Sequence, residues 1–435
     1  MLFFFLKEFW SDNKIISHMS DQKYCIGIEE VYQAKERIKD HAIVTPLMHY
    51  DNLASLCGCN LNLKLETMQR CKAFKFRGAL NKLRTVPSGS TVVAVSAGNH
   101  SQGVALAASL TNCKSIIYMP ENAPSSKVQA TQHYGGSVIQ IGSTFDEAKS
   151  EMMKALAQHP EWVFVPPYND PHVIAGTGTI GLEILDQMRD VDTVVVPIGG
   201  GGLISGIALT LKTLKPSIRI IGVNMASCPY TYKKFNEAKG RDFSLGSHEA
   251  MTPLADGIAV KSPGELNLKI IYDLVDDVVV VNEDEVAMSV ALLAERAKII
   301  SEGAGATSFA AVYNHKFSFR KDEKIVCIVS GGNITLRMLS RCIDRALFLR
   351  RARISVSVVV PYGTSHLAAL IQLFSKHHAE VVSCLSAPHV DTVANKEQYL
   401  IIIDVDCEDV ITAIKQDCEA KGWNFNVQGT TSIGE

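Results

Sequence analysis

The stretch Thr193-Val194-Val195-Val196-Pro197-Ile198-Gly199-Gly200-Gly201-Gly202-Leu203 decides the fold that the sequence predicts. Its β-branched start is typical of a buried strand, and the four glycines that follow indicate a tight turn. The next segment, Ser205–Leu214, has the length and apolar spacing of a helix. A strand that runs through a glycine turn directly into a helix is typical of parallel sheets covered by helices. The sequence therefore predicts an α/β protein.

The same alternation of short apolar runs and helical segments extends from residue 91 to residue 340. The further expected strands are Thr91–Val95, Ser115–Met119, Ser137–Ile141, Ile218–Val223 and Lys324–Val329. Glycine turns at Gly98 and Gly331 also follow a strand directly. Because the carboxyl ends of parallel strands share one edge of a sheet, all of these turns can face one ligand-binding crevice.

A lysine between two aromatic residues adds chemistry to this crevice, in Ala73-Phe74-Lys75-Phe76-Arg77-Gly78-Ala79. An apolar wall or a nearby cation, such as Phe74, Phe76 and Arg77 offer, lowers the pKa of a lysine amine, and a neutral amine can form a Schiff base with an aldehyde. The tetraglycine turn exposes successive backbone N–H groups to a phosphate at a helix start. Pyridoxal 5'-phosphate carries both an aldehyde and a phosphate, so the two motifs together indicate this cofactor.

One further glycine pattern, Gly176-Thr-Gly178-Thr-Ile-Gly181, matches the dinucleotide fingerprint. No apolar strand precedes it and no acidic residue follows at the required spacing, so we expect helix packing there and no nicotinamide site.

The pattern changes after about residue 345. Strands are expected at Ile354–Val360, Glu380–Leu385, Gln398–Val405 and Trp423–Val427, with helical spacing between the first two and between the last two. This βαββαβ order is that of the ferredoxin-like unit.

The motifs, taken in this order, resemble the threonine/serine dehydratase family of pyridoxal-phosphate enzymes, which also contains serine racemase. The resemblance covers roughly residues 25–340, with Glu66-Thr67-Met68-Gln69 leading into the lysine segment. It implies a fold-type-II enzyme, in which two parallel-sheet subdomains enclose a cofactor crevice, with Lys75 as the catalytic Schiff-base lysine. The chain departs from the family at Ala73, where a serine is usual, and this departure bears on turnover.

The resemblance also implies roles for individual residues. Phe74 would lie against the cofactor ring, Asn99 would bond its phenolic oxygen, and Ser330 would face its pyridine nitrogen. The full expected cofactor-binding set is Phe74, Lys75, Asn99, Gly199, Gly200, Gly201, Gly202, Leu203 and Ser330. The loop expected to hold the substrate carboxylate is Ser96, Ala97, Gly98 and His100. Glu302 stands at a family position near the active-site face, where a charged helix terminus is the alternative.

The implied reaction converts L-threonine to 2-oxobutanoate and ammonia, with L-serine giving pyruvate as a second reaction. Serine racemases carry a serine where this chain has Ala97, and racemisation needs a proton carrier on each face of the planar intermediate. Asn224 stands where racemases place a metal-binding glutamate, so we expect no metal site. A racemase and a non-catalytic amino-acid sensor remain alternatives. A sulfhydrylase is less compatible, because such enzymes show threonine where this chain has His100.

The expected domains are an N-terminal extension (1–24), a catalytic domain (25–344), a basic linker (345–353) and a C-terminal domain (354–435). The last resembles an ACT domain, for which an amino-acid or nucleotide effector is the implied partner. The acidic-x-Pro-Gly turn of such domains is replaced by Pro361-Tyr362-Gly363, which argues against effector binding.

The composition limits which kinds of partner the chain is expected to bind. The 435 residues carry a formal net charge of −2, which gives no electrostatic case for nucleic acid or an anionic membrane surface. No apolar stretch reaches the length of a membrane span. The eleven scattered cysteines are expected as free thiols in a reducing cytoplasm. The family resemblance implies a homo-oligomer, a dimer or a tetramer.

Overall fold

The computed structural model describes residues 24–242, 254–387 and 395–428. Except for Tyr24, the expected N-terminal extension lies outside these residues. The chain divides into two units, Met1–Thr335 and Leu336–Glu435. This division falls before the junction expected at residues 345–353, because Leu336–Leu349 forms helix α14, which belongs to the second unit.

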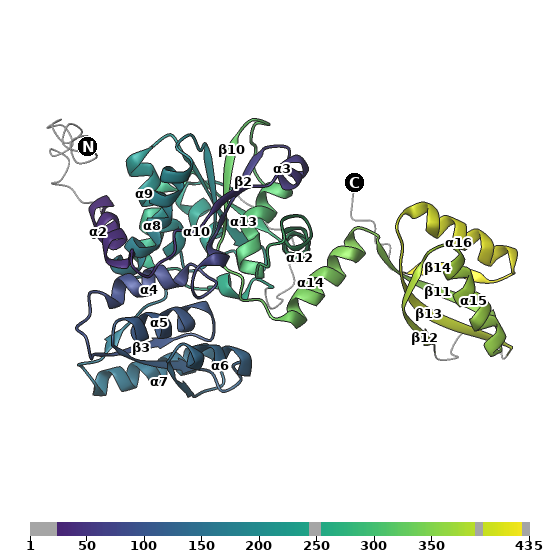
Figure 1. Cartoon of the computed structure of the whole chain (residues 1–435), viewed down its shortest axis with the longest axis horizontal. Helices are drawn as coiled ribbons and strands as arrows, with labels where there is room; N and C mark the ends of the chain where they lie inside the picture. Colours follow the sequence, from purple (N-terminus) through teal and green to yellow (C-terminus); the bar gives the residue numbers. More distant parts are fainter. Residues whose placement is uncertain (1–23, 243–253, 388–394, 429–435) are drawn as a thin grey trace. The chain divides into compact units, whose positions relative to one another are not determined.

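The first unit contains two sheets, shown with their helices in Figure 1. The larger sheet has the strand order β1-β2-β10-β7-β8-β9, and only β1 runs antiparallel to its neighbour. Its strands are β1 (Leu47–His49), β2 (Asn60–Leu65), β7 (Thr193–Pro197), β8 (Arg219–Met225), β9 (Asp277–Val281) and β10 (Lys324–Val329). The smaller sheet, in the order β5-β4-β3-β6, is parallel throughout. Its strands are β3 (Thr91–Val95), β4 (Lys114–Met119), β5 (Ser137–Gln140) and β6 (Val163–Phe164).

Helices cover these sheets and separate them. Those of the first unit are α2 (Ile28–Ile38), α3 (Asp51–Cys57), α4 (Lys75–Leu83), α5 (Asn99–Leu110), α6 (Ser125–His133), α7 (Phe145–Gln158), α8 (Pro171–Gln187), α9 (Gly202–Leu214), α10 (Tyr230–Ala238), α11 (Glu265–Leu274), α12 (Glu283–Leu292) and α13 (Gly303–Tyr313). Helix α4 packs on α8 and on α5, and thus joins the two subdomains. Each sheet has its own apolar core, one around β7, α9 and β8 and the other around β3, α4 and α5.

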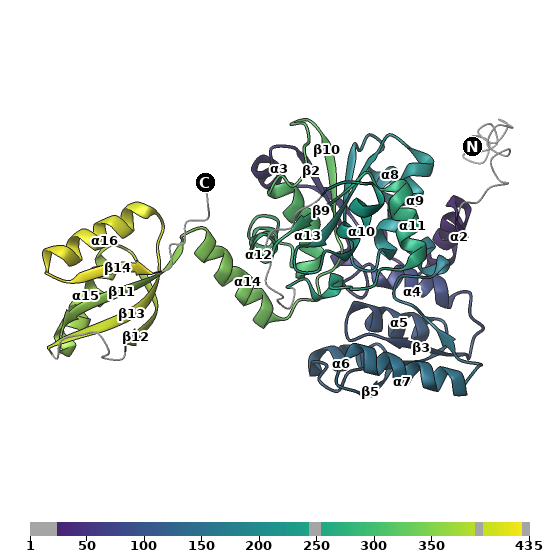
Figure 2. The same cartoon turned by 180° about the vertical axis from the view of Figure 1, so that it is seen from behind.

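The second unit carries helix α14 and an antiparallel sheet in the order β12-β13-β11-β14 (Figure 2). Its elements are β11 (Arg353–Pro361), α15 (Thr364–Lys376), β12 (Glu380–Ser386), β13 (Lys396–Asp404), α16 (Glu408–Ala420) and β14 (Asn424–Gln428). The expected βαββαβ order is therefore confirmed. Alternate residues of β11, including Val356 and Val358, are fully buried in one core with residues of both helices such as Phe374 and Ile414.

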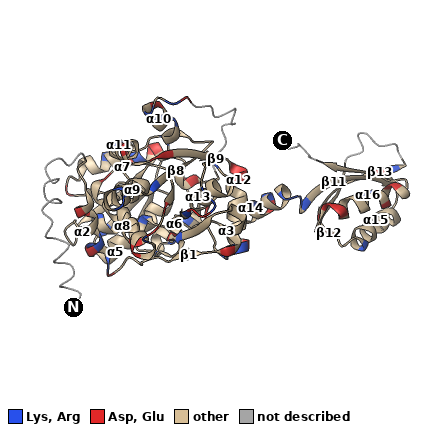
Figure 3. Ribbon diagram, turned by 90° about the horizontal axis from the view of Figure 1, so that it is seen from above, with Lys and Arg blue, Asp and Glu red and all other residues tan. Residues whose placement is uncertain are grey.

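The six strands expected in the first unit are all present, with ends that differ by at most a few residues. Four strands were missed, namely β1, β2, β6 and β9. Acidic and basic residues are interspersed along the described part of both units (Figure 3). None of the described helices combines the length and the apolar character that crossing a bilayer requires.

Candidate active site

The candidate site lies where strands of both sheets end. Strand β7 leads into the glycine turn, β3 leads into the loop before α5, and β10 leads into Ser330. Backbone contacts tie the lysine segment to the end of β10: the Phe74 N–H donates to the Ser330 carbonyl (3.1 Å), and Ala73 and Gly331 form an antiparallel bridge. The fold therefore brings the lysine to the glycine turns that follow the strands.

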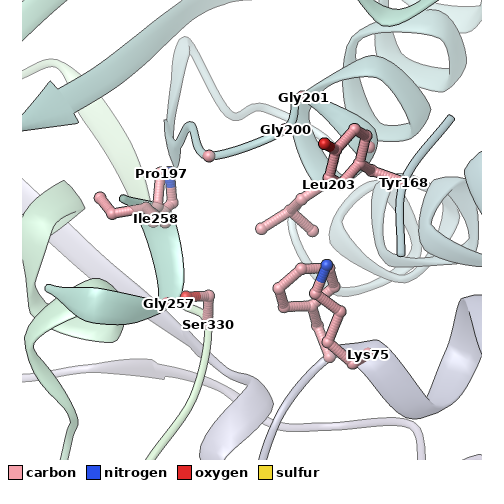
Figure 4. A pocket seen from close by; sticks show the side chains of 12 residues that line it. Lys75, Tyr168, Pro197, Gly200, Gly201, Leu203, Gly257, Ile258 and Ser330 are labelled. Atoms are coloured by element: carbon pink, nitrogen blue, oxygen red, sulfur yellow. The ribbon is translucent and has the colours of Figure 1, made fainter. Parts of the chain in front are cut away.

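Lys75 is the first residue of α4, and its amine points into a cavity beside Tyr168 and Leu203 (Figure 4). The Lys75 Nζ lies 5.1 Å from the centroid of the Phe74 ring and 6.0 Å from that of Tyr168, and it donates to the Pro167 carbonyl (2.8 Å). Burial lowers the pKa of Lys75 from 10.5 to about 8, although the Glu302 carboxylate opposes this shift. A neutral amine is thus accessible near neutral pH.

Two of the three neighbours expected to act on this amine lie elsewhere. Phe76 is buried in the core between α4 and β3. Arg77 is buried and forms ion pairs with Glu66 (2.8 Å) and Glu183 (2.5 Å). Of the three, Phe74 lies under the Lys75 amine as expected, and it precedes the helix. Phe76 and Arg77 follow Lys75 on α4, where residues one or two positions apart point in different directions.

The tetraglycine turn is a cradle in which side chains do not fit. A Cβ added at Gly200 would overlap the Tyr168 ring, and one at Gly202 would lie 2.9 Å from the Tyr168 Cβ. Gly201 has φ of 94°, in the left-handed region that favours glycine. Helix α9 begins at Gly202, so its positive end faces the same cavity. Backbone N–H groups and a helix N-terminus are a suitable site for a phosphate.

Asn99 is held by two neighbours at the first turn of α5. Its Nδ2 donates to the Glu302 Oε1 (2.6 Å), and its Oδ1 accepts from the Asn333 Nδ2 (2.7 Å). Burial and the nearby Asp256 raise the pKa of Glu302 from 4.5 to about 7, against the bond from Asn99. Glu302 is also the residue before α13, so a helix-terminal position and an active-site position coincide.

The loop expected to hold a substrate carboxylate opens α5. The Gly98 N–H donates to the Ser96 Oγ (3.1 Å), and Ala97 packs against the core of the smaller subdomain. His100 is buried and its Nε2 donates to the Val165 carbonyl (2.9 Å), which fixes the tautomer since a carbonyl only accepts. Burial lowers the pKa of His100 to about 3, so the imidazole is neutral. The N-terminus of α5 is therefore better suited than the neutral imidazole to hold an anion.

Ser330 follows β10 and lines the same cavity as Lys75. Its hydroxyl is buried and lies 3.5 Å from the Ala304 carbonyl, at the limit of a hydrogen bond. A hydroxyl offers no negative charge to a ring nitrogen at this position.

The glycine pattern at Gly176, Gly178 and Gly181 lies within helix α8, and the predicted helix packing is confirmed. A Cβ at Gly176 would lie 2.6 Å from the Arg77 carbonyl of α4, and one at Gly181 would lie 2.9 Å from Thr210 of α9. These glycines allow close helix approach.

Three site residues were not assigned a role from the sequence. Tyr168 covers the glycine turn and its hydroxyl donates to the Ser262 carbonyl (3.0 Å). Asn333 bonds Asn99, and Asp256 pairs with Lys127 of the other subdomain (2.8 Å) near Glu302. Tyr168 lies in a Pro-Pro-Tyr-Asn-Asp-Pro stretch and Asn333 in a glycine turn, so unusual loop composition was the available signal.

Comparison with known proteins gives consistent matches. Residues 38–331 match the family model described as "Pyridoxal-phosphate dependent enzyme". The L-threonine ammonia-lyase of Thermotoga maritima is 37% identical over 411 residues, which cover 93% of this chain and all of that protein. The catabolic L-threonine dehydratase of Escherichia coli K12 is 40% identical over 320 residues, 73% of this chain and 95% of that protein.

Solved structures give the same picture. The processed form of threonine deaminase isoform 2 from Solanum lycopersicum matches with a TM-score of 0.66 and 34% identity, over 73% of this chain and 94% of that chain. Maize serine racemase matches with a TM-score of 0.67 and 33% identity, over 75% of this chain and all of that chain. Overall similarity therefore does not by itself separate a lyase from a racemase.

Proposed function

Since the chain belongs to the pyridoxal-phosphate dependent enzymes, we propose that it is a carbon–nitrogen lyase that converts L-threonine to 2-oxobutanoate and ammonia, and L-serine to pyruvate and ammonia. The observation that carries this proposal is the pairing of a buried lysine amine, with its pKa lowered to about 8, and a tetraglycine cradle on one cavity.

The residues present fit the cofactor. Lys75 would hold its aldehyde, the N–H groups of Gly199–Gly202 would hold its phosphate, and Phe74 and Ser330 line the space between them. A Cβ at Gly200 would fill part of the cradle, which explains a glycine there. Bound pyridoxal phosphate supplies a covalent attachment and withdraws electrons from the amino acid's Cα.

The chain's own groups would then act on the substrate. The Lys75 Nζ would take the Cα proton, and the protonated amine could supply a proton to the β-hydroxyl, which would leave as water. The N-terminus of α5 offers backbone N–H groups to the substrate carboxylate, while neutral His100 adds no charge. The enamine that is released gains water and gives the 2-oxo acid and ammonia. Because Ser330 does not hold a ring nitrogen protonated as a carboxylate would, prompt loss of the hydroxyl is favoured.

A racemase is the second candidate, because serine racemase shares this fold. Ala97 has no exchangeable proton for the second face of the substrate. The Asn224 side chain is occupied by backbone groups, as it donates to the Ile198 carbonyl (2.7 Å) and accepts from the Tyr232 N–H (2.8 Å). Both features favour the lyase.

For the C-terminal unit we propose an ACT-like domain in which the usual acidic-x-Pro-Gly turn is altered. Pro361 ends β11, Tyr362 is exposed, and Gly363 precedes α15 with φ of 132°, so the altered turn joins β11 to α15. We expect no response to amino-acid or nucleotide effectors. All eleven cysteines are free, in keeping with a reducing cytoplasm. A dimer or tetramer is expected and is measurable by light scattering.

The test is an assay of ammonia and 2-oxo acid release from L-threonine, L-serine and 3-hydroxyaspartate. Lys75→Ala should lower the rate by about 10²–10⁴-fold or more and remove the visible absorbance of the bound cofactor. The exposed Lys72, mutated to alanine, is the matched control and should keep both. Retention of both properties by Lys75→Ala would reject Lys75 as the anchor. Formation of D-serine would favour the racemase, and ligand-dependent melting without ammonia would favour a sensor.

A further inference from the structure

The Asn333 side chain joins three segments that surround the candidate site. Its Nδ2 donates to the Cys71 carbonyl (2.8 Å), just before the lysine segment, and to the Asn99 Oδ1 (2.7 Å) at the start of α5. The Asn333 backbone N–H also lowers the pKa of the Glu302 carboxylate, which precedes α13. One residue therefore links the segments that carry the lysine, the amide and the buried acid.

These bonds fix which way each carboxamide points. A backbone carbonyl only accepts, so the end of Asn333 that faces Cys71 must be its NH₂ group. The same NH₂ group reaches Asn99, which must present its oxygen there. The Asn99 NH₂ group is then left to face the Glu302 Oε1 (2.6 Å). A flipped Asn99 would place its oxygen against this carboxyl oxygen and its NH₂ against that of Asn333, so the network allows one orientation.

This orientation leaves one N–H for a ligand. The Asn99 Nδ2 has two hydrogens, and among the described residues its one acceptor is Glu302. Gly331 keeps this space open, because a Cβ there would overlap the Glu302 carboxylate and lie 3.2 Å from the Asn99 Nδ2. A donor fixed in this way suits an oxygen acceptor on a cofactor.

We propose that Asn333 is a positioning residue, which holds the Asn99 carboxamide so that its remaining N–H donates to the phenolic oxygen of pyridoxal phosphate; this rests on the function proposed above. Asn333 acts through Asn99 and need not touch the cofactor itself. Loss of Asn333 frees the carboxamide to rotate, so the donor faces the cofactor only part of the time.

The test compares Asn333→Ala, Asn99→Ala and the double variant. Two properties are measured: the Kd of the cofactor-free protein for pyridoxal phosphate, and the ratio of the absorbance bands of the ionised and neutral phenolic forms of the bound cofactor across pH. Asn333→Ala should weaken binding by about fivefold to tenfold and raise the neutral band, because a donor stabilises an ionised oxygen. In the Asn99→Ala background the same change should add less than about twofold.

Two further variants keep the result interpretable. Asn314→Ala is the control, since the Asn314 Nδ2 also donates to a backbone carbonyl, that of Ala310 (2.8 Å), away from the site. It should leave both properties unchanged. Asn333→Asp keeps the side-chain volume but offers acceptors in place of the donor, so it should raise the neutral band at least as far as alanine does. This variant serves if Asn333→Ala fails to fold.

Each outcome decides one question. An unchanged band ratio in Asn333→Asp, or in a folded Asn333→Ala, would overturn the inference, as would effects of the Asn99 and Asn333 substitutions that simply add. Both of those results leave the proposed function standing. If the wild-type protein takes up no pyridoxal phosphate, the proposed function fails, and the inference fails with it.

Discussion

Replacing Lys75 by methionine should stabilise the cofactor-free protein while it abolishes turnover. Burial lowers the pKa of Lys75 from 10.5 to about 8, which means that the folded protein disfavours the charged amine. At about 1.36 kcal/mol per pKa unit, lowering the Lys75 pKa from 10.5 to about 8 costs about 3 kcal/mol of stability at neutral pH. Methionine fills a similar volume without a charge, so Lys75→Met should recover an amount of this order.

The stability gained by Lys75→Met should depend on pH. Below about pH 8 the amine is protonated in both states, and the whole cost is present. Between about pH 8 and 10.5 the folded protein has lost the Lys75 proton while the unfolded chain still holds it, so wild-type stability rises with pH relative to the variant. The advantage of Lys75→Met should therefore shrink from about 3 kcal/mol at about pH 7 to about 1.4 kcal/mol at about pH 9.5.

Urea unfolding of protein stripped of cofactor, at both pH values, measures this difference. Lys72→Met is the control, because its side chain is exposed, and it should change stability by less than about 0.5 kcal/mol at either pH. A Lys75→Met protein that is no more stable than wild type at neutral pH, or whose advantage grows with pH, would refute a strained buried amine.

Three further predictions follow from the same site. Gly200→Ala should cost about 1–3 kcal/mol and weaken cofactor binding at least about tenfold, because the new Cβ overlaps the Tyr168 ring; titration with normal affinity would contradict the cradle. Arg77→Met should lower the free energy of unfolding by about 3–5 kcal/mol, since it leaves two buried carboxylates short of a partner, whereas Arg84→Met on the exposed end of α4 should have little effect. The pKa of Glu302 is raised to about 7 in the folded protein, so folding is disfavoured as the pH rises from 4.5 to about 7 and the carboxyl group ionises. Over that range wild type should lose about 3 kcal/mol of stability relative to Glu302→Gln. Parallel pH profiles of unfolding for the two proteins would argue against a raised Glu302 pKa.

The sequence predicted those parts of the site whose signal is local. The tetraglycine turn follows an apolar strand and precedes a helix within eleven residues, Thr193 to Leu203, so strand, turn and anion site are all visible in one window. Lys75 stands out for the same reason, because its neighbours in sequence are informative. In the second unit, apolar and polar residues alternate along β11 and β13, which predicts a sheet with one buried face. The order of strands and helices then predicts the ferredoxin-like fold of this unit.

The sequence did not predict features that depend on distant partners. Strand β2 was missed although its leucines alternate with Asn62 and Lys64; such alternation predicts a half-exposed strand, whereas both of these polar side chains are buried. In the structure Lys64 is fully buried and forms an ion pair with Glu183 (2.6 Å), which lies 119 positions away in the sequence. Asn333 and Asn99 are likewise 234 positions apart. Neither pairing leaves a local sequence pattern. A polar residue is expected on the surface unless a buried partner is known, and these partners are distant in sequence.

The two ionisable groups of the site illustrate why these distant contacts matter for chemistry. Burial lowers the pKa of Lys75 and raises that of Glu302, so each environment favours the neutral form of its group. An ion pair between them would stabilise the protonated amine, which cannot attack an aldehyde. Glu302 accepts from Asn99, and the Asn333 backbone N–H also lowers its pKa, so these amides favour the charged carboxylate and oppose the effect of burial. The amide network thus orients a donor, whereas burial is what keeps the Lys75 amine available for reaction near neutral pH.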